Sequence, residues 1–346
     1  MNSKTLVAAL IAVPALVALK PLADSVLFQP EDGSSASKEY SINAAFSLGD
    51  FSAMVDGADM SEGVPGDFEM TGEILMSVTD QYVSSLSGRP VELIRTFDSL
   101  SMTWETPDDS GEDEDIGDLE GKSVLFKWNA EDEDYDKAFH ECEGDEDDLE
   151  DLTPEIDIQA LLPDGDVSEG DTWTLESSDL STLMVFGSDM SEIDMSDLGD
   201  GDEIEELFST EINPQLTELI DTFEAQCEYT GTRDLDGKTL GVIAVTLRGE
   251  GDVDLTGVIS GLAESQIPAE VEIELSIDEA AITIVLEGEG ELLWDIEAGL
   301  FHSYDLTAEV ELLADVALSV NAQGEDHDLE ASAEVLGEMI WSASVN

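Results

Sequence analysis

Apolar and polar residues alternate with a period of two along most of this chain. The longest such run lies at 302–320, where the even positions are nearly all apolar and the odd positions mostly polar. After Gly324 the phase changes, and the odd positions of 327–341 become the apolar set. Successive side chains of a strand point to opposite faces, so this pattern predicts antiparallel strands with one buried and one solvated face.

Shorter stretches at 68–78, 124–128 and 271–277 repeat the alternation. The two C-terminal runs are much longer than a typical strand of about 5–6 residues. Long strands coil, and a glycine or a bulge supplies the bend. The string Gly-Glu-Gly occurs at 249–251 and again at 288–290, so we expect the bends there.

Helical spacing is confined to the middle of the chain. Asn213-Pro214 is typical of an N-cap followed by proline at the first helical position, and apolar residues continue at helical spacing to about Ala225. Shorter helical patterns lie at 179–186 and 204–212. The sequence therefore predicts a small helical insertion over 179–225.

The order of strands, helical insertion and strands predicts a mainly β fold. We expect a long, curved antiparallel sheet, like half of a barrel, with helices on one face or capping one end. Residues 40–346 would form this single large domain, with acidic loops at 108–118 and 131–151. Residues 26–39 are expected to be a flexible lead-in.

Residues 1–25 are typical of a signal peptide. Lys4 gives a positive start, 6–19 is apolar, and Ala23-Asp24-Ser25 offers small residues for cleavage after Ser25. The apolar stretch is shorter than the roughly 20 residues of a spanning helix, and its retention as an uncleaved anchor is the alternative. We predict an exported protein in the periplasm, the cell envelope or the extracellular medium.

Charge narrows the set of partners. The chain has 84 Asp and Glu against 11 Lys and Arg, a net charge of −73. It would repel the phosphates of nucleic acids and anionic membrane surfaces, so we expect neither as a partner. Self-repulsion disfavours a compact state and salt screens it, which indicates halophilic adaptation with cations as counterions. Specific uptake of divalent cations is the alternative.

Four carboxylates suggest calcium as a cofactor. Asp132, Asp134, Asp136 and Glu143 occupy the first, third, fifth and twelfth positions of a calcium-loop template. The template needs glycine at its sixth position, where this chain has Lys137. Among so many acidic residues chance also produces this spacing. No other cofactor is suggested.

The two cysteines, Cys142 and Cys227, permit one disulfide. An even cysteine count in an oxidising compartment favours a bridge. Cys142 lies in an acidic loop and Cys227 on a predicted strand, and the sequence does not establish the geometry that a bridge requires. Both the bridged and the free form are kept as alternatives.

No motif for catalysis occurs. The chain lacks GxSxG, HExxH, CxxC and GxGxxG. The strings at 117–123 and 231–239 resemble phosphate-binding loops, but their glycines have the wrong spacing, so no nucleotide is expected. Asp236-Gly237 is better explained as a hairpin turn between strands at 226–233 and 239–248. We predict that the protein is not an enzyme.

Five tryptophans lie on or beside predicted strands. Aromatic side chains carry the largest apolar area, so core positions explain them. The functional alternative is that Trp128, Trp294 and Trp341 line an apolar ligand cavity under the curved sheet.

A short pattern carries a resemblance. Residues 161–173 contain Leu-Pro and then Val-x-x-Gly-Asp-x-Trp, with Gly88-Arg89-Pro90 upstream and Trp294-Asp295 and Gly299 downstream. Over 40–345 the chain resembles an uncharacterised family of exported, β-rich bacterial proteins. The resemblance implies export and supplies no catalytic residues. The strand pattern is also similar to that of lipoprotein-carrier half-barrels.

Three functions are compatible with these observations. The first is an exported, non-enzymatic protein that binds an apolar or amphipathic ligand in its curved sheet; an enclosed apolar cavity would favour it and a filled core would count against it. The second is a structural or calcium-dependent component of the cell envelope. The third is a membrane β-barrel, against which the helical insertion and the acidic wet faces argue.

Overall fold

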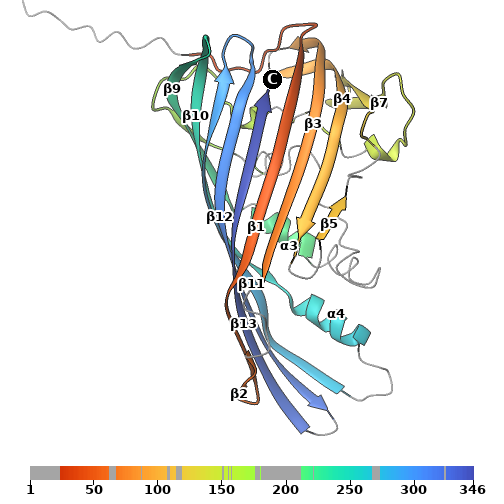
Figure 1. The fold of residues 1–346 in the computed structure, drawn as a ribbon, viewed down its shortest axis with the longest axis vertical. Helices are drawn as coiled ribbons and strands as arrows, with labels where there is room; N and C mark the ends of the chain where they lie inside the picture. Colours follow the sequence, from red (N-terminus) through yellow and green to blue (C-terminus); the bar gives the residue numbers. More distant parts are fainter. Residues whose placement is uncertain are drawn as a thin grey trace, which may run out of the picture.

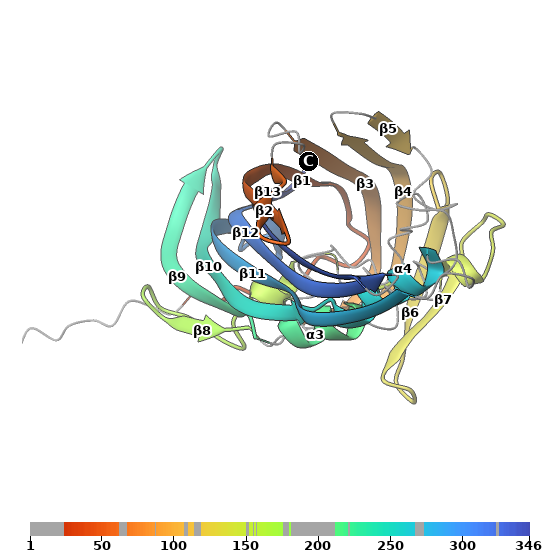
Figure 2. The same cartoon turned by 90° about the horizontal axis from the view of Figure 1, so that it is seen from below.

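The computed structural model describes residues 24–61, 68–86, 88–106, 110–113, 119–149, 152–154, 156, 158–175, 180, 212–220, 222–266, 273–322 and 325–346. Strands dominate these residues and form one long, curved antiparallel sheet (Figure 1). Viewed at right angles, the strands follow an open arc (Figure 2). The predicted mainly β fold with a curved antiparallel sheet is confirmed.

The described residues contain a 13-stranded sheet in which β7 and β8 are the two edges, so its main path does not close. Its order is β7-β6-β4-β3-β1-β13-β12-β11-β10-β9-β8, with β2 paired to β1 and β5 to β4. The strands are β1 (Ser35–Val55), β2 (Ala58–Asp59), β3 (Glu69–Leu86), β4 (Arg89–Glu105), β5 (Ser110–Asp113), β6 (Ser123–Asn129), β7 (Asp134–Phe139), β8 (Thr172–Thr174), β9 (Glu224–Leu235), β10 (Lys238–Asp254), β11 (Ile273–Asp295), β12 (Leu300–Ala322) and β13 (Glu325–Val345).

The longest strands extend beyond the core. β12 and β13 pair without a register shift from Ser303 opposite Ser344 to Ala322 opposite Glu325. We call the distal part of these strands the arm: 273–284 of β11, 312–322 of β12, 325–335 of β13 and 51–55 of β1. The arm projects away from the rest of the sheet, with α4 (Thr256–Gln266) beside it (Figure 1).

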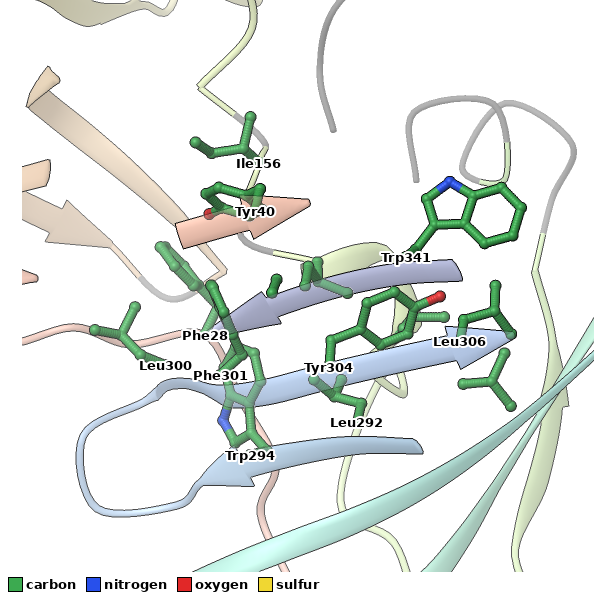
Figure 3. Packing of buried hydrophobic residues seen from close by; sticks show 14 of the residues in the cluster. Phe28, Tyr40, Ile156, Leu292, Trp294, Leu300, Phe301, Tyr304, Leu306 and Trp341 are labelled. Carbon is green, nitrogen blue, oxygen red and sulfur yellow. The ribbon is translucent and has the colours of Figure 1, made fainter. Parts of the chain in front are cut away.

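The other half of the sheet encloses a cluster of packed apolar side chains, which we call the filled core. Trp294, Trp341 and Tyr304 are fully buried on its inner face and belong to one cluster with Phe28 of the lead-in and Ile156 (Figure 3). Segments outside the sheet complete this cluster. They include two 3-10 turns, η2 (Asp147–Leu149) and η3 (Gln159–Leu161), and further apolar residues up to Leu180.

The lead-in predicted to be flexible at 26–39 is packed instead. Val26 and Phe28 are buried, the amide of Gln29 donates to the carbonyl of Gly299, and β1 already begins at Ser35. The alternating apolar residues of this short stretch explain the difference, because they extend the core at one end of the sheet.

The acidic segment predicted as a loop at 131–151 contains a strand. β7 lies in its first half and pairs with β6, while β5 lies within the predicted loop at 108–118. Tyr135 is buried between the exposed Asp134 and Asp136, so one apolar residue anchors β7 in spite of its charges.

The helical insertion is seen only in part. α3 (Asn213–Ile220) begins at the predicted Asn213-Pro214 but ends earlier than predicted, because Ala225 already belongs to β9. Most of 179–211, with its other predicted helices, lies outside the described residues. α4 was not predicted, since its sequence has weak periodicity and two glycines; the carboxylate of Asp254 accepts a hydrogen bond from the amide of Thr256 at its start.

The two Gly-Glu-Gly strings, where bends were expected, contain no bulge. β10 and β11 pair without a register shift from Leu240 to Asp254, and the shifts of β11 fall elsewhere, at Ile277/Glu279 and Leu293/Trp294. A side chain at Gly249 would collide with the ring of Phe223. Gly249 and Gly251 therefore make room for the segment that packs on the sheet, whereas Gly288 and Gly290 lie close to the neighbouring strand β12. No helix among the described residues is long and apolar enough to cross a membrane.

The predicted hairpin at Asp236-Gly237 is confirmed. Both residues have positive φ angles, 50° and 84°, and they join β9 to β10. Two successive positive φ values are typical of the tight turns that match the twist of a hairpin.

Candidate functional site

The four carboxylates of the calcium template are not assembled. Asp134 and Asp136 lie on the extended strand β7, whereas the template requires a tight loop at these positions. Asp132 and Asp136 instead accept hydrogen bonds from the side-chain amide of Asn129, at 2.9 and 3.3 Å. In the described part of the chain, no group of three or more His, Cys, Asp or Glu side chains is placed to hold a metal ion.

The two cysteines are not bridged. Both are free; Cys142 follows β7, and Cys227 is buried on β9 toward the opposite edge of the sheet. Burial raises the pKa of the Cys227 thiol to about 12, so this thiol is unreactive at neutral pH.

The three tryptophans proposed as cavity lining do not share a site. Trp294 and Trp341 are fully buried in the core, which supports the structural interpretation for both. Trp128 lies apart on β6, where the guanidinium carbon of Arg89 is 3.6 Å from the centre of its ring and Tyr135 packs edge-on at 5.2 Å.

The residues on which the family resemblance rests form a turn in the structure. Gly170 has a φ of 90°, its amide donates to Tyr229, and the carboxylate of Asp171 accepts the amide of Ser168 at 2.8 Å. This turn leads into β8, where Trp173 pairs with Cys227. The roles seen here are structural.

A buried ionic cluster was missed by sequence reasoning. The carboxylate of Asp80 on β3 accepts hydrogen bonds from Lys38 of β1 at 2.6 Å and from Arg95 of β4 at 2.8 and 3.0 Å. All three side chains are almost completely inaccessible. Burial alone would raise the pKa of Asp80, but the guanidinium and ammonium groups outweigh it and hold the pKa at about 2.

This cluster fastens a loop to the sheet. Arg95 also donates to the carbonyl oxygens of Thr153 and Pro154, at 3.0 and 3.1 Å, and Lys38 donates to the hydroxyl of Tyr82 at 2.7 Å. The sequence did offer an indication of this cluster, because Lys38 lies on the same face of β1 as the buried residues Ala36 and Tyr40. These hydrogen bonds and ion pairs hold the loop against the core. The charged side chains of the cluster are buried, so a substrate would not reach them.

An exposed apolar surface lies beside the filled core. We call it the cradle. It is formed by side chains on the inner face of β1, β3 and β4, in the part of these strands that lies farther from the ionic cluster. In the registers of these strands Phe46 is opposite Met70, Ile74 opposite Met102, and Gly72 opposite Trp104. The cradle consists of Phe46, Met70, Gly72, Ile74, Met76, Met102 and Trp104.

The cradle is uncharged but open to solvent. Met70 is 38% and Ile74 36% exposed, and Phe68, just before β3, is 41% exposed. Phe46 and Met76 pack against the main core, so the cradle continues the core outward. Three methionines give it an adaptable surface, because an unbranched thioether side chain repacks easily around different shapes.

Two clefts are open to solvent, and neither is an enclosed apolar cavity. One of about 530 Å³ lies where β13, β1, β3 and β4 meet at Gly72, and its lining includes Glu73, Glu105 and Glu338. The other, of about 660 Å³, lies between the lead-in and the β11–β12 turn. In the described part of the chain, packed side chains such as Trp294 and Trp341 occupy the inner positions of the core, and the cradle is the exposed apolar surface that we take as the candidate.

No family model and no curated protein matches the chain. Among solved structures it is similar to the outer membrane protein OprG from Pseudomonas aeruginosa, with a TM-score of 0.20 and 8% identity over 91% of this chain and 97% of that one. It is also similar to a mutant of the Rh. blastica porin, with a TM-score of 0.15 and 7% identity over 89% and 100% of the two chains. TM-scores this low do not establish a shared fold.

Proposed function

We propose that the protein is exported and non-enzymatic, and that it holds an apolar or amphipathic ligand on the cradle. The observation that carries this proposal is a cluster of exposed apolar side chains on the inner face of a curved sheet. Soluble monomers rarely leave contiguous apolar patches exposed unless a ligand or partner covers them. The export signal predicted at 1–25 and the resemblance to exported β-rich proteins support the location.

Charge restricts the class of ligand. A net charge of −73 disfavours an anionic head group anywhere near the surface. The ligand is therefore an uncharged, zwitterionic or cationic amphiphile whose apolar part contacts the cradle. Contact with about 300 Å² of apolar surface would contribute roughly 7 kcal/mol before the cost of association, so binding should be micromolar or weaker.

The test uses the neutral dye Nile red as a probe and a matched pair of variants. Ile74→Asn places an amide on the cradle, whereas Leu75→Asn places it on the other face of β3, where Leu75 is 41% exposed. We expect the first variant to weaken dye binding about tenfold and the second to leave it unchanged. Equal affinity in both variants, with both folded by circular dichroism, would exclude the cradle as the binding surface.

Lipid extraction and native mass spectrometry of protein from its own host test the ligand itself. A bound apolar or amphipathic molecule, lost in Ile74→Asn and kept in Leu75→Asn, is the expected result. A bare protein mass in every preparation would contradict the proposal.

A cation-dependent structural role is the second candidate. Glu287, Glu309 and Glu338 lie directly opposite one another on β11, β12 and β13, and like charges in such positions are destabilising. Cations would relieve this repulsion as counterions, in line with the proposed halophilic adaptation. Calcium that raises the melting temperature beyond sodium at equal ionic strength would favour a specific calcium role; equal effects would favour screening alone.

The membrane β-barrel is the least supported alternative. A spanning sheet must satisfy its backbone hydrogen bonds by closing. The main path of the sheet in the described residues is open, with β7 and β8 at its edges.

A further inference from the structure

We propose that the apolar face of the arm is an interface between two copies of this chain. The face is formed by side chains that point to the same side of the sheet as the core side chains of the same strands. Val316 lies opposite Ala280 and Ala331, Ala53 lies opposite Ala331, and Leu318 lies opposite Leu329. All but Ala280 are partly exposed. Four adjacent strands thus present an apolar surface, which is bounded on the β11 side by α3 and α4, where Leu219 and Val258 pack near Ile284, and toward the β12–β13 turn by His327, which pairs with Asp56.

The size of this face reaches the lower limit of what a dimer needs. Three strands of the arm are roughly 35 Å long and β1 adds only roughly 17 Å as a fourth, so at about 4.8 Å per strand the face measures about 580 Å². A typical monomer leaves its largest apolar patch at about 300–600 Å². Two such faces packed together would bury nearly 1,200 Å² (roughly twice 580 Å²), the lower limit of the range of about 1,200–2,000 Å² of stable interfaces.

The shape of the face also suits a second sheet. Ala53, Ala331 and Ala280 share one row across the strands with Val316, so the middle of the face is flat. Two sheets pack face to face at about 10 Å when their inner side chains interdigitate. The larger Leu318 and Leu329 lie in the next row and could fill the space over the alanines of the partner.

Charge favours a second copy over a membrane. No Lys or Arg follows Arg248, so the part of the arm built from β11, β12 and β13 has neither of these residues with which to hold an anionic lipid surface, and its His327 is paired with Asp56. Glu330 and Glu334 occupy the opposite face of β13 and would stay in water when the apolar faces meet. The repulsion between two copies is screened by salt, so dimerisation should strengthen as salt rises.

The first test measures the mass of the full protein by sedimentation at low and at molar salt. We expect a monomer at low salt and a concentration-dependent dimer at molar salt. Leu329→Asn should weaken the dimer at least about tenfold. Leu336→Asn makes the same change on the opposite face of β13, where Leu336 is 45% exposed, and should leave it intact.

The second test measures thiol labelling and is independent of sedimentation. In a Cys142→Ser background, labelling of Ala331→Cys should slow at molar salt as protein concentration rises, while labelling of Ser332→Cys should not. A monomer at every salt and protein concentration would overturn the proposal. So would equal dimerisation of the two asparagine variants, or binding of monomers to phosphatidylcholine vesicles that Leu329→Asn abolishes.

Discussion

The two halves of β12 carry the same alternation of apolar and polar residues but lie in different surroundings. In the half near the core, Tyr304, Leu306 and Ala308 are buried and their neighbours are exposed. In the arm, Val316 and Leu318 occupy the same inward parity and are only partly buried. Alternation therefore identifies the apolar face of a sheet, and other segments of the chain decide whether that face is covered.

The largest effect on stability is expected at the buried ionic cluster, which fastens a loop over the core. Asp80→Asn removes the carboxylate that Lys38 and Arg95 both contact in the interior. Breaking a buried ion pair typically costs about 3–5 kcal/mol. Urea unfolding should show a loss of this size. Asp236→Asn, in the exposed β9–β10 turn, is the control and should change stability by less than about 0.5 kcal/mol.

A matched pair of leucines compares the two halves directly. Leu306 is 3% exposed, whereas Leu318 is on the same strand and the same face in the arm. Leu306→Ala should cost roughly 2–5 kcal/mol and Leu318→Ala less, about 1–2 kcal/mol, because the second side chain is only partly buried. Thermal or urea unfolding at low salt measures both. Equal losses would mean that the arm is as well packed as the core.

Lowering the pH should change stability in opposite directions through the buried carboxylate and through the surface carboxylates. The pKa of Asp80 lies at about 2 in the folded protein against 3.8 without its surroundings, so its stabilisation is present above about pH 4 and is lost as pH falls toward 2. This shift corresponds to roughly 2 kcal/mol.

Surface carboxylates have the opposite effect, because their protonation relieves repulsion. Melting temperature should therefore rise as pH falls from 7 to about 4.5 and drop below about pH 4. A continuous rise down to pH 2 would contradict the role given to Asp80.

The smallest effect on stability is expected from substitutions of acidic residues on the outer face of the sheet. Glu309→Gln removes a charge lying between Glu287 and Glu338 and should raise stability at low salt by about 0.2–1 kcal/mol. Glu291→Gln removes the negative charge that accepts two hydrogen bonds from Arg233, at 2.6 and 2.8 Å, and should lower stability slightly. Both differences should shrink at molar salt. Changes of the same sign would refute the interpretation of the outer face.

The sheet was predictable from sequence because a period of two follows directly from strand geometry. The hairpin at Asp236-Gly237 and the start of α3 at Asn213 were predictable for similar local reasons. α4 was missed because its apolar spacing is weak, and β7 because the burial of Tyr135 depends on a neighbouring strand. The packed lead-in was missed because its few apolar residues gain their stability from distant parts of the chain.

The candidate site was less predictable than the fold. Tryptophans were expected to mark a ligand surface, yet Trp294 and Trp341 lie in the filled core. The exposed surface consists instead of methionines and Ile74, whose exposure depends on where the covering segments end. The ionic cluster joins Lys38, Asp80 and Arg95 through the pairing of three strands, which a sequence pattern does not show.

Thiol labelling of two inward positions tests the central claim most directly, which is that one apolar face is covered in one half of the sheet and open in the other. Leu306→Cys and Leu318→Cys would be compared in the Cys142→Ser background at low salt with a maleimide reagent. Rapid labelling of Leu318→Cys and strong protection of Leu306→Cys is the predicted result. Equal protection of both positions in folded protein would contradict it.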